Sequence, residues 1–221
     1  LRQEWVESSL SDLEQEEPDD LMMHPLRLAL EVQSLMNQND WLVIDGGNTH
    51  FWSEIAVNMA GAQGKELAGI LHPGSFSMLG VGVSFGLAAK LNHPKERVVV
   101  ISGDGAFLSG GLSIEAAFQE NVPITVVIDN NGGLTTISQQ QERLFADERH
   151  VATDFRDIPF HTMFEGMGGH GELVEKPEDL KPALERALSS GKTACVNVRT
   201  RSAISPIVLA TTSKRDKASI E

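Results

Sequence analysis

Asp104 and Asn131 have the side-chain types and the sequence setting that a divalent cation requires. Each follows a short apolar run, Val98–Ile101 for Asp104 and Ile124–Ile128 for Asn131. Carboxylate and amide oxygens are the ligands that magnesium and calcium prefer. Four glycines flank the two residues: Gly103, Gly105, Gly132 and Gly133. Because glycine has no Cβ atom, the backbone there can approach an ion or a phosphate closely, and the pattern predicts a diphosphate held through a divalent cation.

The elements that position these residues form one strand–helix–strand unit. Both apolar runs are β-branched and short, which is typical of strands buried in a parallel sheet. Leu112–Gln119 between them is predicted to be a helix. A right-handed crossover brings the carboxyl ends of both strands to one edge of the sheet, where α/β proteins bind ligands. The alternative interpretation is an ordinary connection of this kind with polar strand ends.

These residues together resemble the cofactor-binding motif of thiamine-diphosphate enzymes. The motif is Gly-Asp-Gly, a helix and a strand, then Asn-Asn, and Asn131 lies 27 positions after Asp104. The resemblance implies thiamine diphosphate and Mg²⁺ as cofactors. It also implies that Asp104, Asn131 and the backbone carbonyl of Gly133 bind the metal. Backbone groups near the metal are expected to contact the cofactor: those of Gly103, Gly105, Ala106, Leu134 and Thr135.

A second glycine turn follows a predicted strand at Trp41–Ile44, and a helix is expected from about Phe51. By itself this is a simple strand-to-helix connection. In context it resembles the loop of the family that contacts the cofactor diphosphate, with Asn48 and Thr49 as polar donors.

Gly74–Lys90 is predicted to be a glycine-rich helix. Its small residues leave one face without bulky side chains, so that face can pack closely against a flat surface. Packing on the sheet alone explains that pattern. The segment is also similar to the family segment that holds the aminopyrimidine ring. The resemblance implies that Leu79 wedges beneath the cofactor and that backbone groups of Ser77 and Leu79 bind the pyrimidine.

Composition limits the remaining function classes. A chain of 221 residues suits one α/β domain, and we expect a parallel sheet of about six strands flanked by helices, the thiamine-diphosphate-binding fold. A net charge of −13 disfavours nucleic acid and anionic membranes as partners. No run of about 18 apolar residues and no signal peptide are recognised, so a cytoplasmic location is expected. The single cysteine, Cys195, is expected in a buried strand.

Three regions are expected along the chain. Residues 1–23 are interpreted as a linker or surface segment, residues 24–201 as the cofactor domain, and residues 202–221 as a tail that could cover the active site. A nucleotide P-loop is excluded because Gly64-Lys65 lacks a following Ser or Thr. A dinucleotide fingerprint is excluded because Leu108 stands where its last glycine belongs.

Within the thiamine superfamily, the chain looks most similar to 2-hydroxyacyl-CoA lyases and oxalyl-CoA decarboxylases. The resemblance implies a C–C lyase or carboligase that cleaves or forms a 2-hydroxyacyl-CoA; the alternative is a 2-oxo-acid decarboxylase or an acetolactate synthase-like enzyme. The activating glutamate is expected on a separate pyrimidine-binding domain or subunit, in a dimer or tetramer, so no catalytic residue is assigned to this chain. A hypothesis of another class is a non-catalytic subunit or excised domain that holds the cofactor.

Overall fold

A single parallel sheet organises the described part of the chain, which in this computed structural model comprises residues 22–145 and 149–210. Its six strands lie in the order β2-β1-β3-β4-β6-β5. The strands are β1 (Trp41–Asp45), β2 (Gly69–Leu71), β3 (Val98–Gly103), β4 (Thr125–Asn130), β5 (His170–Val174) and β6 (Ala194–Arg199). The predicted α/β fold with about six parallel strands is therefore confirmed.

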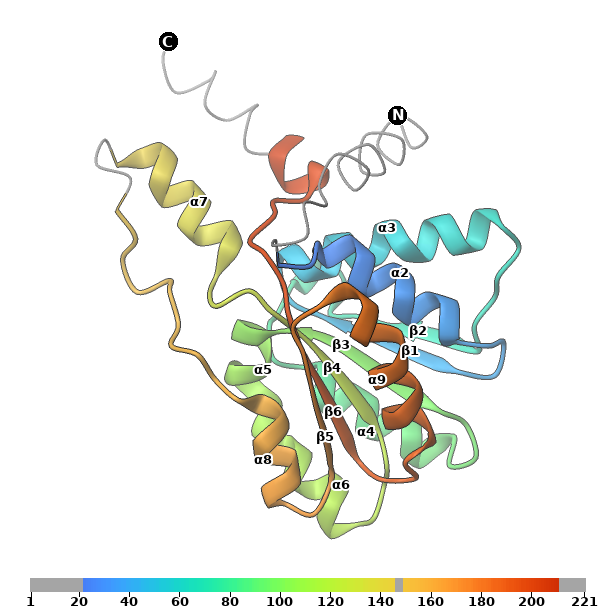
Figure 1. Cartoon of the computed structure of the whole chain (residues 1–221). Helices are drawn as coiled ribbons and strands as arrows, with labels where there is room; N and C mark the ends of the chain where they lie inside the picture. Colours follow the sequence, from blue (N-terminus) through green and yellow to red (C-terminus); the bar gives the residue numbers. More distant parts are fainter. Residues whose placement is uncertain (1–21, 146–148, 211–221) are drawn as a thin grey trace.

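Helices cover both faces of the sheet, so the fold has three layers (Figure 1). The helices are α2 (Pro25–Leu35), α3 (Asn48–Ala62), α4 (Gly82–Asn92), α5 (Asp104–Gly110), α6 (Glu115–Gln119), α7 (Thr135–Leu144), α8 (Phe160–Gly166) and α9 (Pro177–Ser189). On one face, α2 and α9 pack on side chains such as Ile101 and Val127. On the other face, α4 and α8 pack on Val100 and Val126. Alternate residues of each strand therefore enter opposite halves of the core, as strand geometry requires.

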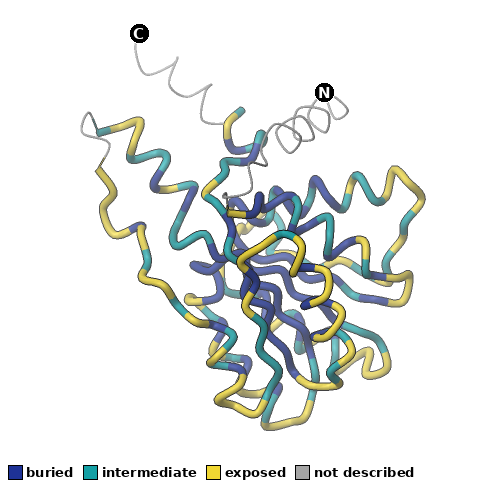
Figure 2. The backbone as a smooth tube through the Cα atoms, in the orientation of Figure 1, coloured by how far each residue is buried: buried dark blue, intermediate teal, exposed yellow. Residues whose placement is uncertain are grey.

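Burial on both faces explains why the central strands are continuous apolar runs. Every residue of β3 and β4 is buried, and the sheet forms the dark centre of Figure 2. Cys195 in β6 is fully buried, as predicted. In contrast, α7 extends away from the carboxyl edge of the sheet (Figure 1). None of the helices described is both long enough and apolar enough to cross a membrane.

The predicted helix over Gly74–Lys90 is wrong in its first half. Gly74–Phe76 is a short 3₁₀ turn, and α4 begins only at Gly82. Ser77 has φ +50° and Gly80 has φ +89°, both outside the right-handed helical region, so the chain turns here before it enters the helix. The segment is a loop followed by a helix, not one helix.

Three other elements also differ from the predictions. The edge strand β2 was not predicted, because three residues that include a glycine carry little periodic signal. A Cβ atom on Gly69 would lie 2.3 Å from the Trp41 ring, so close packing requires glycine there. The helix expected from about Phe51 begins at Asn48, and the segment after Gly103 is helical from Asp104 onward, before the predicted start at Leu112.

All three predicted regions lie partly outside the described residues, the middle one only at residues 146–148. Residues 1–21 and 211–221 are not described, so the interpretation of the first segment and the tail concerns mainly residues 22–23 and 202–210. Met23 is buried and pairs with Thr200 next to the end of β6. Residues 206–210 form a helical turn.

Candidate functional site

The carboxyl edge of the sheet brings Asp104 and the loop after β4 together. Gly103, the last residue of β3, pairs with Asp129 in β4. Asp104 then begins α5, and its carboxylate accepts three backbone hydrogen bonds. Oδ1 accepts from Gly105 N at 2.6 Å, and Oδ2 accepts from Gly132 N at 2.8 Å and Gly133 N at 3.0 Å. The predicted metal ligands Asp104 and Gly133 are therefore in direct contact.

The Asp104 carboxylate is costly to ionise in this position. Its side chain is buried, and burial raises its pKa to about 7, with a further contribution from the neighbouring charge of Asp129. The three backbone N–H donors oppose this shift but do not cancel it. A divalent cation beside the carboxylate would favour its charged form, because an opposite charge at short range stabilises the ionised group.

The side chain of Asn131 supplies a second oxygen for a cation. Its Oδ1 atom is buried and has no hydrogen-bond partner among the described residues. A buried amide oxygen without a donor costs free energy, whereas a hard divalent cation would satisfy it. The carbonyl of Gly133 accepts a hydrogen bond from Thr135 N at 3.1 Å. The carboxylate, the orphaned amide oxygen and the adjoining carbonyl fit the oxygen donor set that Mg²⁺ requires.

Thr49 and Asn48 begin α3, but their side chains are bound to other parts of the chain. Thr49 Oγ1 donates to Oδ2 of the fully buried Asp129 at 2.7 Å, and Thr200 Oγ1 donates to the other oxygen. Asn48 Oδ1 accepts from Ser205 N at 2.7 Å, and its Nδ2 donates to the carbonyl of Ala203. Their expected contact with a diphosphate stays a prediction. In this structure the Thr49 side chain binds buried Asp129, and the Asn48 side chain binds the backbone at the start of the tail.

Asp129 is the second carboxylate under the site, and sequence reasoning did not single it out. Burial raises its pKa, while the two threonine hydroxyls lower it. Its signal in the sequence was an acidic residue directly after the apolar run Ile124–Ile128. Because this carboxylate lies beside Asp104, it adds negative potential where a cation is expected.

The N-termini of α3 and α7 meet at this edge, and no side chain among the described residues caps either one. A Cβ atom on Gly47, the N-cap of α3, would lie 3.7 Å from Oγ1 of Thr136 in the first turn of α7. That hydroxyl is buried and lacks a partner among the described residues. Uncapped helix N-termini attract anions, so the first turn of α7 is suited to a phosphate, although Thr135 N already donates to Gly133 O. Thr136 was missed because a Thr pair at a helix start is common.

Buried Asp45 at the end of β1 holds the turn that precedes α4. Its carboxylate accepts from Gly80 N at 3.1 Å and from Gly82 N at 2.7 Å. Burial raises its pKa, and these backbone bonds lower it. Leu79 stands just before the anchored turn with 37% of its surface exposed. Ser77 N donates to Gly74 O at 3.1 Å, so this N–H is used inside the turn. Asp45 was also missed, although a carboxylate before two glycines at a strand end is a readable signal.

The remaining predicted cofactor contacts lie close around Asp104. Gly103, Gly105 and Ala106 are buried, and Leu134 is the N-cap residue of α7. A Cβ atom on Gly105 would lie 2.4 Å from Leu134 Cδ2, so glycine permits the close approach of these two loops. The structure thus collects the residues predicted near the metal at one edge of the sheet.

The fold and the site define a class of protein: an α/β domain in which buried oxygen atoms suited to a cation lie beside two uncapped helix N-termini, a setting suited to a diphosphate. Residues 45–198 match the family model described as thiamine pyrophosphate enzyme, C-terminal TPP binding domain. The chain belongs to this family. The predicted membership is confirmed, and it supports thiamine diphosphate as the cofactor.

Curated relatives match most of this chain, and the chain spans about a third of their length or less. The acetolactate synthase large subunit of Mycobacterium tuberculosis is 35% identical over 199 residues, which are 88% of this chain and 35% of the relative. The catabolic acetolactate synthase of Raoultella terrigena is 28% identical, over 80% of this chain and 30% of the relative. The 2-hydroxyacyl-CoA lyase 2 of Mus musculus is 30% identical, over 78% and 26%.

Proposed function

We propose that this chain is the part of a thiamine-diphosphate-dependent enzyme that binds the diphosphate and Mg²⁺, in an enzyme that forms or cleaves C–C bonds. The observation that carries the proposal is the pair of oxygens at the sheet edge. Burial disfavours the charged form of the Asp104 carboxylate and raises its pKa. The amide oxygen of Asn131 is buried and accepts no hydrogen bond from the described residues. A divalent cation resolves both costs at once.

Each group of this chain has one role in the proposal. Asp104, Asn131 and the Gly133 carbonyl hold the cation, and the helix start at Thr135 and Thr136 faces the diphosphate. The turn anchored by Asp45 presents Ser77 and Leu79 to the aminopyrimidine ring. When bound, the cofactor supplies an electron sink for the pair released as a C–C bond breaks. The glutamate that activates it is expected on a pyrimidine-binding domain or subunit, within a dimer or tetramer located in the cytoplasm.

Two reactions remain for the whole enzyme. One is cleavage or formation of a 2-hydroxyacyl-CoA, giving a carbonyl compound and formyl-CoA, which the sequence resemblance placed first. The other is a reaction of the acetolactate synthase type on small 2-oxo acids. The higher identity and wider coverage of the mycobacterial acetolactate synthase favour the second reaction. Either activity requires groups beyond the third of the relatives that this chain spans.

Titration calorimetry with thiamine diphosphate tests the proposal on the isolated 221-residue chain. We expect saturable binding in Mg²⁺ that is lost in EDTA, because the ion bridges the protein to the diphosphate. Asp104→Ala should abolish the Mg²⁺-dependent part, while Asp157→Ala, which removes an exposed carboxylate paired with Arg199, should bind as the wild type does. Equal affinity of the Asp104 variant and the wild type would refute the metal assignment.

A further inference from the structure

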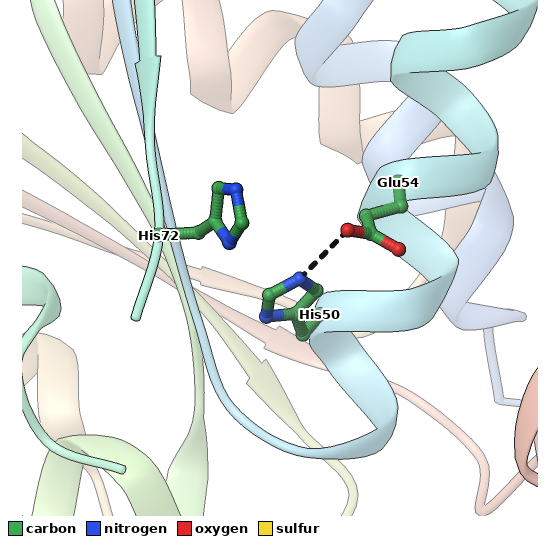
Figure 3. A group of neighbouring side chains, drawn as sticks. All are labelled: His50, Glu54 and His72. Carbon is green, nitrogen blue, oxygen red and sulfur yellow. Dashed lines mark hydrogen bonds and ion pairs between the residues drawn. The ribbon is translucent and has the colours of Figure 1, made fainter. Parts of the chain in front are cut away.

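A second group of metal-ligating side chains lies apart from Asp104 and Asn131. His50 and Glu54 stand one turn apart on α3, and His72 follows directly after β2. Each residue offers one ligand atom, and these atoms all lie within 4.8 Å of one another. Figure 3 shows the three side chains, which come from the helix and the neighbouring strand end and face the same space. We propose that His50, Glu54 and His72 form a second metal site, one that takes a borderline divalent transition metal of the Zn²⁺ class.

The spacing of the three side chains suits coordination after a small adjustment. His50 Nε2 lies 3.0 Å from Glu54 Oε1, and the rings of His50 and His72 meet edge to face with centroids 5.1 Å apart. Tetrahedral Zn²⁺ with bonds near 2.1 Å needs its ligand atoms about 3.4 Å apart. His72 is exposed, so its side chain can close the remaining distance without moving buried atoms.

The backbone that carries the ligands is held rigidly. Trp52 and Ile55, on the same helix, are buried in the cluster that packs α3 against α2. Leu71, the residue before His72, pairs with Val43 in β1. The ligands therefore start from a fixed framework, which reduces the entropy that metal binding must overcome.

The chemistry of the three ligands separates this site from the magnesium site. Two imidazoles and one carboxylate are the ligands of open three-residue zinc sites, in which further positions are left for water or substrate. Mg²⁺ instead prefers oxygen ligands throughout. The pocket that the three residues line has a volume of about 370 Å³ and also includes Gly47 and Ser77, so an open position on the metal would face the loops assigned to the cofactor.

Metal binding would rearrange one contact of the turn after β2. Gly74 N donates to His72 Nδ1 at 3.2 Å. A metal on Nδ1 replaces this bond, and a metal on Nε2 moves the ring proton to Nδ1 and removes its capacity to accept. The occupied site is therefore linked to the Gly74–Phe76 turn, which leads to Ser77 and Leu79.

Zinc titration of the full chain in excess Mg²⁺ tests the proposal, because Mg²⁺ occupies the oxygen site and leaves the histidine site to Zn²⁺. After removal of bound metal with EDTA and then of the EDTA, we expect one equivalent of Zn²⁺ to bind, measured by competition with a chromophoric chelator. His72→Gln and Glu54→Gln each remove one of the three ligands and should weaken Zn²⁺ binding at least about 100-fold. Loss of a residue that only supports a ligand would weaken it by about 10- to 100-fold.

Two control variants make the result specific. His93→Gln removes a histidine that stacks on Trp41, and Asp157→Asn changes an exposed carboxylate paired with Arg199; both should bind Zn²⁺ with wild-type affinity. Circular dichroism of each metal-free variant verifies the fold. Because His72 is exposed, His72→Gln should disturb the fold least. No stoichiometric Zn²⁺ binding, or equal affinity in His72→Gln, Glu54→Gln and the wild type, would overturn the proposal. The outcome is independent of the thiamine diphosphate test, since no cofactor is present.

Discussion

The buried carboxylate of Asp104 makes the stability of the metal-free chain depend on pH. Its pKa is about 7 in the folded chain and 3.8 for the ordinary group. Between these values the folded state binds more protons than the unfolded state, so the free energy of unfolding falls as pH rises. The difference amounts to about 4 kcal/mol over the full window, of which roughly 2 to 3 kcal/mol is lost between pH 5 and pH 8.

Asp104→Asn removes this titration, because an amide does not ionise. Between pH 5 and pH 8 the free energy of unfolding should therefore fall by roughly 2 to 3 kcal/mol less in the variant than in the wild type. The intercepts will differ for a separate reason: the amide cannot accept from Gly105 N and from Gly132 and Gly133 N at the same time. The comparison therefore uses the difference between the two slopes, in which the contribution that Asp45 makes to both proteins cancels.

Urea unfolding in EDTA, followed by tryptophan fluorescence at a series of pH values, measures the slope. Asp157→Asn, which changes an exposed carboxylate, should keep the wild-type pH dependence. Adding Mg²⁺ at pH 8 should stabilise the wild type and leave Asp104→Asn nearly unchanged, because the ion favours the charged carboxylate. Parallel slopes for wild type and Asp104→Asn would show that burial does not raise the pKa of this group as the structure indicates.

Two further predictions concern packing. An alanine Cβ at Gly110 would lie 2.0 Å from Gly80 O, so Gly110→Ala should destabilise the chain by at least about 1–3 kcal/mol in urea unfolding. At Gly61 nothing lies within 4 Å of an added Cβ, so Gly61→Ala should stabilise α3 by about 0.5–1 kcal/mol. Equal stability of the two variants would contradict this packing. Burial raises the pKa of the Cys195 thiol, so a thiol reagent should label the chain only after denaturation, and mass spectrometry that finds rapid labelling of the folded chain would contradict the burial.

The strongest sequence predictions rest on signals that are local and repeated. Val98–Ile101 and Ile124–Ile128 are apolar throughout because both faces of their strands are covered, and this burial leaves a continuous run that needs no tertiary information to recognise. Asp104 and Asn131 could be paired because parallel strands place their carboxyl ends at one edge. The structure brings Asp104 into contact with the loop after β4, as that rule requires.

The weaker predictions depended on contacts between distant segments. Gly74–Lys90 was predicted to be one helix, but Asp45 accepts from Gly80 N and Gly82 N, and this long-range contact holds a turn where a helix was expected. Asn48 was predicted to be a polar donor to the cofactor diphosphate, and in the structure its side chain accepts from the backbone N–H of Ser205, more than 150 positions later. No local pattern contains such partners.

The sequence alone determined the central strands of the sheet and the edge at which their polar residues meet, because strand burial and polar strand ends can be recognised in consecutive residues. The oxygen ligands for a cation stay a prediction. Only the tertiary structure decided which polar groups are left without partners. Thr136 and Asn131 acquire orphaned oxygens through burial, and burial depends on neighbours from several strands and helices. His50 and Glu54 likewise lie near His72 only because β2 pairs with β1, and α3, which carries His50 and Glu54, follows β1.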